Sequence, residues 1–170
     1  ETLYIINLNA DEAKQVLKAT SDGAKNLFET SVSCIGSSIC QIGLRDSQGL
    51  LNAIIEEVEP YHFADGVLPK IHISGCTSSC GTHQIGSLGF HGSVKRVDNT
   101  PAAAFTLHVG GCDLQGDERF GEEWGAMTAQ DIPKFFVDLG QHISAKSMTY
   151  ETWYAAYPQE LRALAEPYLK

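Results

Sequence analysis

Four cysteines stand in two close pairs, and this arrangement constrains the fold more than any other feature of the sequence. Five residues separate Cys34 from Cys40, and three residues separate Cys76 from Cys80, with 35 residues between the two pairs. Each pair adjoins a predicted helix or strand, so loops at the ends of these elements can direct four side chains at one point. Four thiolates around one centre are what a cubane 4Fe–4S cluster requires. The chain is therefore expected to fold so that two distant loops meet.

Two other interpretations of the cysteines remain open at this point. Structural zinc sites favour cysteines two to four residues apart, which admits the second pair but not the first. Four unrelated buried thiols, or disulfides in an oxidising compartment, are the other alternative. The neighbouring residues favour a cluster, because Gly36, Gly75 and Gly81 let backbone N–H groups approach an anionic object closely. The fifth cysteine, Cys112, is not needed as a ligand and is predicted to be a free thiol.

Charge and hydropathy exclude two classes of partner. The 170 residues carry a net charge of −9 with no basic run longer than Lys95-Arg96, so we expect no nucleic-acid partner. No run of about 18 apolar residues occurs, so we expect no membrane span. Glu1 opens directly into an apolar pattern without a methionine or a leader, which we interpret as a piece of a longer chain. The lack of a leader and the need for reduced thiolates together predict a cytoplasmic location.

Strand and helix patterns alternate along the chain. The predicted strands cover residues 3–8, 69–74, 85–91 and 103–109. The predicted helices cover 9–20, 42–58, 128–144 and 150–168, of which the last is interrupted at Pro158. Residues 24–33 fit either a short helix or an extended approach to Cys34. The expected fold class is α/β (α+β), a mixed sheet with helices packed on it.

Two segments of the sequence resemble the signature of the sirohaem-dependent nitrite and sulfite reductases. Residues 73–92 are similar to a T-G-C-P-N-x-C-G motif followed by I-G-[LF]-x-G, and residues 33–40 are similar to the C-x5-C half-motif. Residues 105–111 resemble the strand of that family that ends in a Gly-Gly turn. The resemblance extends over about residues 1–143.

The resemblance implies two cofactors and the residues that hold them. Cys34, Cys40, Cys76 and Cys80 would ligate a 4Fe–4S cluster, and Cys80 would also bridge to the sirohaem iron as its axial ligand. Thr77, Ser78 and Ser79 would lie near the sirohaem. Ser78 stands where the family usually has Asn, and Thr77 replaces the usual Pro.

The resemblance also implies the C-terminal segment of an oxidoreductase that reduces nitrite to ammonia or sulfite to sulfide with six electrons. In that family the substrate-binding Arg and Lys residues come mainly from an N-terminal half of the same polypeptide. We expect no catalytic residue in this chain, no activity of the chain alone, and two partners, namely that half and an electron donor (ferredoxin or an NAD(P)H-linked flavoprotein). The alternative is a non-catalytic four-cysteine module that binds zinc or a protein.

The expected organisation has three parts. Residues 1–30 would end a preceding ferredoxin-like half-domain, residues 31–145 would form the cluster- and sirohaem-binding domain, and residues 146–170 would form a helical extension. His83 is predicted to lie at the surface or behind the ligands, whereas His72 and His108 alternate with apolar residues and are predicted to face solvent. The isolated Arg45, like Lys70 and Arg96, is predicted to be a solvated surface charge.

Overall fold

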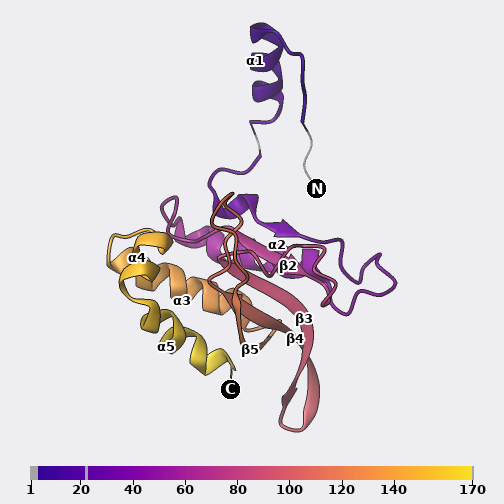
Figure 1. Cartoon of the computed structure of the whole chain (residues 1–170), viewed down its shortest axis with the longest axis vertical. Coiled ribbons are helices and arrows are strands. Elements are labelled where there is room, and N and C mark those ends of the chain that lie inside the picture. Colours follow the sequence, from indigo (N-terminus) through magenta and orange to yellow (C-terminus); the bar gives the residue numbers. More distant parts are fainter. Residues whose placement is uncertain (1–3, 22, 170) are drawn as a thin grey trace.

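A mixed five-stranded sheet forms the centre of the computed structural model, which describes residues 4–21 and 23–169 (Figure 1). Its strands follow the chain order and are β1 (Val32–Ser33), β2 (Ile71–Ser74), β3 (Leu88–Val97), β4 (Thr100–Val109) and β5 (Glu122–Thr128). The first three strands are parallel to one another, and the last two are added in antiparallel fashion. The predicted α/β class with a mixed sheet is therefore confirmed.

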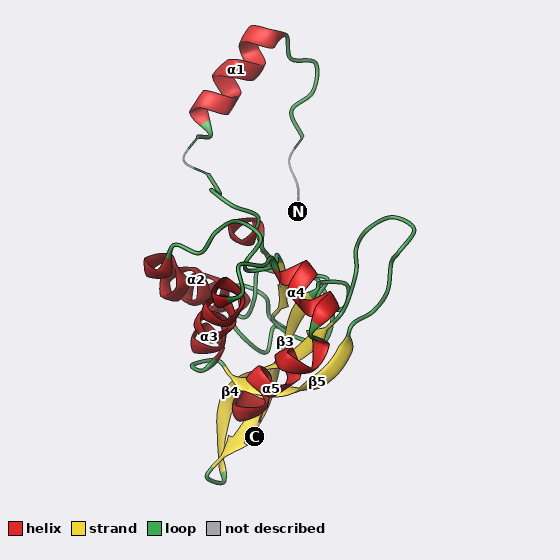
Figure 2. Cartoon of the chain, turned by 90° about the vertical axis from the view of Figure 1, so that its left-hand side faces the viewer, coloured by secondary structure: helices red, strands yellow, loops and turns green. Residues whose placement is uncertain are grey.

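Helices cover one face of this sheet (Figures 1 and 2). The helices are α1 (Ala10–Ala19), α2 (Ser47–Val58), α3 (Ile132–Ala145), α4 (Tyr150–Ala156) and α5 (Pro158–Leu169), with short 3₁₀ turns η1 (Phe28–Thr30) and η2 (Glu59–Tyr61). Helix α2 packs against α3, and α5 packs against both α3 and β5. The helices after residue 146 contribute Trp153, Leu161 and Ala165 to the core, so this tail caps the sheet.

The two faces of the sheet differ in chemistry. Side chains that alternate along the strands, such as Ile71, Ile73 and Phe90, are fully buried against the helices and form the apolar core. The opposite face carries buried polar side chains, among them His72 and His108. The prediction that these two histidines face solvent is wrong, because the segment between β2 and β3 lies across this face of the sheet.

The N-terminal prediction is half right. Tyr4–Leu8 form no strand, since no neighbouring strand offers them a partner, and Leu3 lies outside the described residues. The helix that follows is present as α1, with a capping box in which Asn9 and Glu12 accept each other's backbone N–H groups. None of the side chains of α1 is buried, and the helix projects from the body of the molecule (Figure 1).

Three further differences have local causes. The helix predicted from residue 42 begins only at Ser47, because the Asp46 side chain accepts the N–H of Gly49 and caps it there. Helix α3 starts at Ile132 after Asp131 and not after Thr128, which ends β5. Strand β5 was not predicted. Residues 24–33, predicted to form either a short helix or an extended segment, contain both the 3₁₀ turn η1 and the short strand β1.

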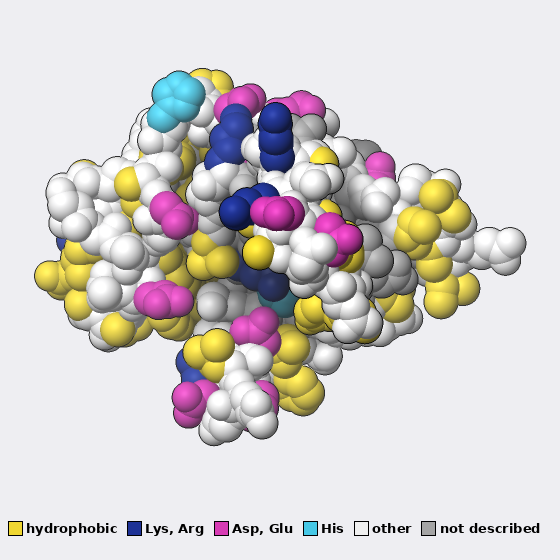
Figure 3. All heavy atoms as spheres, turned by 90° about the horizontal axis from the view of Figure 1, so that it is seen from above, with side chains coloured by type: hydrophobic (Ala, Val, Ile, Leu, Met, Phe, Trp, Pro, Cys, Tyr) yellow, Lys and Arg dark blue, Asp and Glu magenta, His cyan; other side chains and the backbone are white. Residues whose placement is uncertain are grey.

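The surface mixes charges of both signs. The face seen from the α1 side in Figure 3 shows a small group of basic side chains with acidic side chains beside it. In the part of the chain that the structure describes, no helix is long and apolar enough to cross a bilayer.

Candidate functional site

The two cysteine loops leave the sheet at the same edge. Strand β1 ends at Ser33 and runs directly into Cys34, and β2 ends at Ser74, two residues before Cys76. These strands are parallel neighbours, and the N–H of Cys34 donates to the carbonyl oxygen of Ile73 at 3.0 Å. The carboxyl ends of adjacent parallel strands are where ligand sites form in such sheets. The topology therefore brings the two half-motifs together.

Glycines allow the two loops to pack backbone against backbone. The carbonyl oxygen of Gly75 accepts the N–H groups of Leu44 and Arg45 at 3.1 and 2.9 Å. A Cβ on Gly75 would lie 2.6 Å from the carbonyl oxygen of Arg45 and 3.1 Å from the Cα of Gly36. Any larger residue would push the loops apart, so glycine is needed where the cysteines converge.

All four paired cysteines line one cavity of about 490 Å³ at this edge. Cys34, Cys40 and Cys76 are partly buried, whereas Cys80 is exposed. The thiolates that ligate a cubane surround a core of four irons and four sulfides, so their sulfur atoms need not touch one another. The cavity thus gathers a donor set of the kind that such a cluster takes.

The other predicted residues take different places. Ser78 lines the same cavity, whereas Thr77 and Ser79 do not. Cys112 lies outside this cavity, and its backbone pairs with that of Arg119.

Hydrogen bonds surround the sulfur of Cys34. The N–H of Gly75 donates to Sγ at 3.1 Å, and the hydroxyl of Ser47 lies 3.2 Å from the same atom. Ser47 is completely buried, and its Oγ also donates to the carbonyl oxygen of Cys34 at 2.7 Å. Burial raises the pKa of this thiol, but the hydrogen bonds from Ser47, Gly75 and Gly36 together outweigh burial, so that its pKa lies below the ordinary value. The pocket therefore favours a thiolate, the form that binds metal.

The cavity supplies no positive charge for an anionic substrate. Among the described residues that line it, none is Lys or Arg. Arg45 is held by the backbone instead, since its Nε donates to the carbonyl oxygen of Ser93 at 2.8 Å and its Nη1 to that of Leu44. Arg45 is therefore partly exposed, and its guanidinium is anchored to two backbone carbonyl oxygens.

A larger cavity of about 630 Å³ lies elsewhere, between residues 23–29 and residues 55–68. Apolar side chains line it together with Lys25, Asn26, His62 and the three acidic residues Glu29, Glu59 and Asp65, and no cysteine is among the described residues that line it. It is larger than the cysteine cavity, but no group of metal-binding side chains converges in it among the described residues.

The sequence analysis missed one group of residues near the site. His83, predicted to lie at the surface or behind the ligands, is 2% exposed and sits beside His91 and His108. The signal in the sequence was a histidine on each of two strands joined by one tight turn, with Gly89 leaving room beside them. The alternation of apolar and polar residues along the strands could not indicate that a loop covers the polar face of the sheet.

The chain is similar to known reductases over part of their length. It is 31% identical to the ferredoxin–nitrite reductase of Synechococcus elongatus over 127 residues, which make up 71% of this chain and 23% of that protein. It is 32% identical to an assimilatory-type sulfite reductase of Nitratidesulfovibrio vulgaris over 119 residues, 68% of this chain and 50% of that protein. The chain thus spans half or less of the length of these relatives. No protein-family model matches it.

The fold has a counterpart among solved structures. The NirA protein of Mycobacterium tuberculosis superimposes with a TM-score of 0.60, over 77% of this chain and 26% of that one, at 18% sequence identity. This match covers most of the chain and establishes the fold.

Proposed function

We propose that this chain, a distant homologue of nitrite and sulfite reductases over part of their length, is the segment of such an enzyme that holds a 4Fe–4S cluster and one wall of a sirohaem site. The observation that carries the proposal is the convergence of Cys34, Cys40, Cys76 and Cys80 on one cavity. When bound, these groups would supply electrons one at a time to an oxyanion such as nitrite or sulfite.

The surroundings of the cysteines support a cluster. A reduced cluster is more negative than an oxidised one, and N–H donors to its sulfurs stabilise the added charge. Gly75 already donates such a bond to the sulfur of Cys34. The hydroxyl of Ser47, which donates to the carbonyl oxygen of Cys34, lies 3.2 Å from the same sulfur. Both groups are fixed by secondary structure, Gly75 just after β2 and Ser47 at the start of α2.

The exposure of the cysteines supports the proposal that Cys80, and not the other three, would also ligate the sirohaem iron. Cys80 is the exposed member of the four, as a thiolate that also ligates the iron of a sirohaem outside the cavity would have to be. Ser78 lies on the cavity wall, where its hydroxyl would donate to that cofactor, whereas Thr77 and Ser79 do not line the cavity.

Reduction of an oxyanion needs fixed positive charge around the substrate. Since no Lys or Arg lines the cavity in the described part of the chain, we expect that charge to come from another part of the enzyme and the chain alone to be inactive. We further propose an electron donor of the ferredoxin or NAD(P)H-linked flavoprotein kind and residence in the cytoplasm, where thiolates stay reduced.

The test is the iron and acid-labile sulfide content of the chain after anaerobic reconstitution. We expect about four irons and four sulfides per chain, with a brown colour. Cys80→Ser should lose most of both, whereas the matched control Cys112→Ser should retain them, because its thiol lies outside the cavity. Circular dichroism on each variant verifies that the fold is kept.

Two results would contradict the proposal. One is an iron content that falls equally in the Cys112→Ser control. The other is a folded wild-type chain that takes up no iron but binds one zinc through the cysteines, which would identify the non-catalytic zinc module instead.

A further inference from the structure

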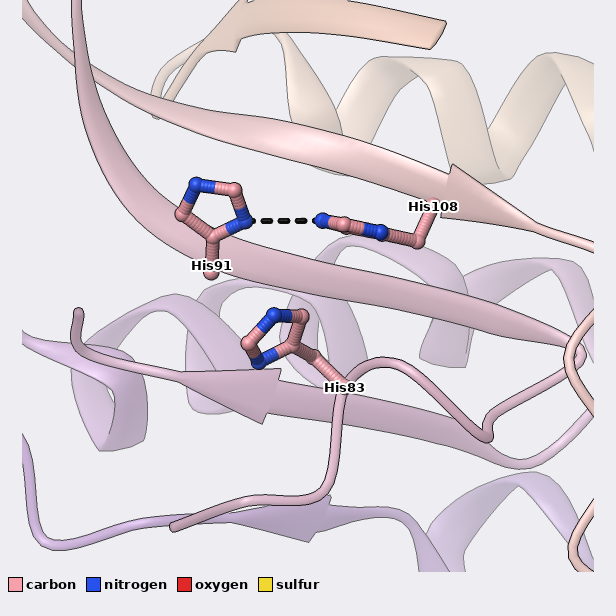
Figure 4. Close-up of side chains that lie close together, drawn as sticks. All are labelled: His83, His91 and His108. Carbon is pink, nitrogen blue, oxygen red and sulfur yellow. Dashed lines mark hydrogen bonds between the residues drawn. The ribbon is translucent and has the colours of Figure 1, made fainter. Parts of the chain in front are cut away.

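Three histidines from three separate segments meet on the polar face of the sheet, apart from the cysteine cavity. His91 comes from β3, His108 from β4, and His83 from the segment between β2 and β3. Their ring centroids lie 4.8–5.0 Å apart, and one nitrogen of each lies within 4.8 Å of the others. Figure 4 shows the imidazole of His83 directed at the His91–His108 pair.

We propose that His83, His91 and His108 form a binding site for a divalent transition metal, with Zn²⁺ as the best match. Imidazole nitrogens are preferred ligands of this ion, at 2.0–2.1 Å, and three histidines with one open position are a known zinc arrangement. Nothing in the proposed reductase function assigns these residues. The proposal therefore stands or falls separately from the cluster.

The distances fit a metal after a small adjustment. Two nitrogens on a tetrahedral Zn²⁺ lie about 3.3 Å apart, given the Zn–N bond length. His91 Nδ1 and His108 Nε2 are 2.8 Å apart and share a hydrogen bond, and the remaining separations reach 4.8 Å at most. The pair must open by about 0.5 Å and His83 must move inward. The ring that donates the hydrogen bond of the pair must carry its proton on its other ring nitrogen, so that both imidazoles bind the metal as neutral ligands and no net proton is released.

The orientation of His83 is fixed by a hydrogen bond behind it. Its Nδ1 lies 2.9 Å from the hydroxyl oxygen of Ser74, which also accepts the N–H of Gly81 at 3.1 Å. When His83 donates from Nδ1, its other nitrogen is left with a free lone pair toward the other two rings. Metal-binding histidines are held in this way by a partner on the second nitrogen.

Charge and burial also suit a cation held by neutral ligands. Burial lowers the pKa of all three imidazoles, so that each keeps a lone pair at neutral pH. Glu123 of β5 stands opposite His108 in the sheet register, and its charge acts on both His91 and His108. This carboxylate would offset part of the charge of a bound cation.

Gly89 leaves room for the segment that carries His83. Gly89 pairs with His108 across the β3–β4 ladder, and a Cβ on Gly89 would lie 1.7 Å from the carbonyl oxygen of His83. The backbone of the His83 segment thus rests directly on β3, which holds the third ring within reach of the other two.

The experiment is a titration of the full-length, reduced chain with Co²⁺, a spectroscopic substitute for Zn²⁺. Cobalt bound to cysteine shows a thiolate charge-transfer band in the near ultraviolet, whereas cobalt bound to histidine shows only weak visible bands. We expect the chain to bind one equivalent of cobalt with the weak visible bands of histidine ligation, in addition to any cobalt bound to the cysteines. Zn²⁺ should displace it and raise the melting temperature.

Variants identify the ligands. His108→Gln should abolish the histidine-type equivalent, and Ser74→Ala should weaken it by about 10–100-fold, as loss of a supporting partner does. The matched control His62→Gln changes an exposed histidine outside the group and should bind as the wild type does. Should His108→Gln fail to fold by circular dichroism, His91→Gln replaces it. Two results would overturn the proposal. One is that all bound cobalt shows thiolate bands. The other is that the His108→Gln and His91→Gln variants still bind the histidine-type equivalent of cobalt.

Discussion

The buried hydroxyl of Ser47 gives the most direct test of how the cysteine loop is held. Ser47→Ala removes the hydrogen bond that it donates to the carbonyl oxygen of Cys34 at 2.7 Å, and its contact with Sγ at 3.2 Å. Loss of the partner of a buried acceptor costs about 1–3 kcal/mol. Alanine in the first turn of α2 gains back about 0.5 kcal/mol of helix propensity. We therefore expect a net loss of about 0.5–2.5 kcal/mol in the free energy of unfolding.

Urea unfolding of the reduced chain at neutral pH measures this loss. With an m-value of about 2 kcal/mol/M, the midpoint should fall by about 0.3–1.3 M at constant m. Ser93→Ala is the matched control, because the hydroxyl of Ser93 is buried without a hydrogen-bond partner and its removal should be neutral or stabilising. The pH dependence of alkylation at Cys34 should also shift upward in Ser47→Ala, since one of the bonds that lowers its pKa is gone. The reasoning is refuted if both serine variants have the same midpoint.

Two further predictions concern the C-terminal helices. Trp153→Ala should cost about 3–5 kcal/mol in urea unfolding, because Trp153 is fully buried, whereas Trp124→Ala, at a partly exposed site, should cost clearly less. Hydrogen bonds from His142, Trp153 and Lys146 hold the pKa of Glu160 at about 2, below its ordinary value of 4.5. Because the folded pKa is the lower one, the stabilisation is complete above pH 4.5 and is lost as the pH falls toward 2. The difference in melting temperature between wild type and Glu160→Gln should accordingly shrink as the pH falls through this range, and a difference as large at pH 2 as at pH 7 would contradict the assignment.

Local patterns predicted those parts of the fold that depend on nearby residues. The alternation around Ile71 and Ile73 predicted β2 and its buried face, and the Asn9 capping box predicted the start of α1. Pro158 marked the break between the last two helices. For the cysteine site, the position of each pair at the end of a regular element indicated that the loops could meet, and parallel pairing of β1 with β2 is how they do so.

The remainder depended on contacts that no local pattern encodes. Tyr4–Leu8 have strand-like composition but no strand beside them, and strand composition alone does not form a sheet. Strand β5 begins with Glu122 and Glu123, which masks its alternation. The histidine group was missed because a strand pattern separates two faces without indicating which of them another segment will cover. The domain boundaries near residues 30 and 145 stay predictions.

The order of strands along the chain also affects how the molecule folds. Strands β3 and β4 are joined by a two-residue turn at Asp98 and Asn99, both with positive φ, and such a hairpin forms within about 1–10 μs. Strand β1 instead pairs with residues about 40 positions away, as between Val32 and His72, and contacts of this length form slowly. The edge that gathers the cysteines should therefore be completed late, after the hairpin exists. During that interval the thiols are unprotected, so oxidation of a newly made chain competes with completion of this edge.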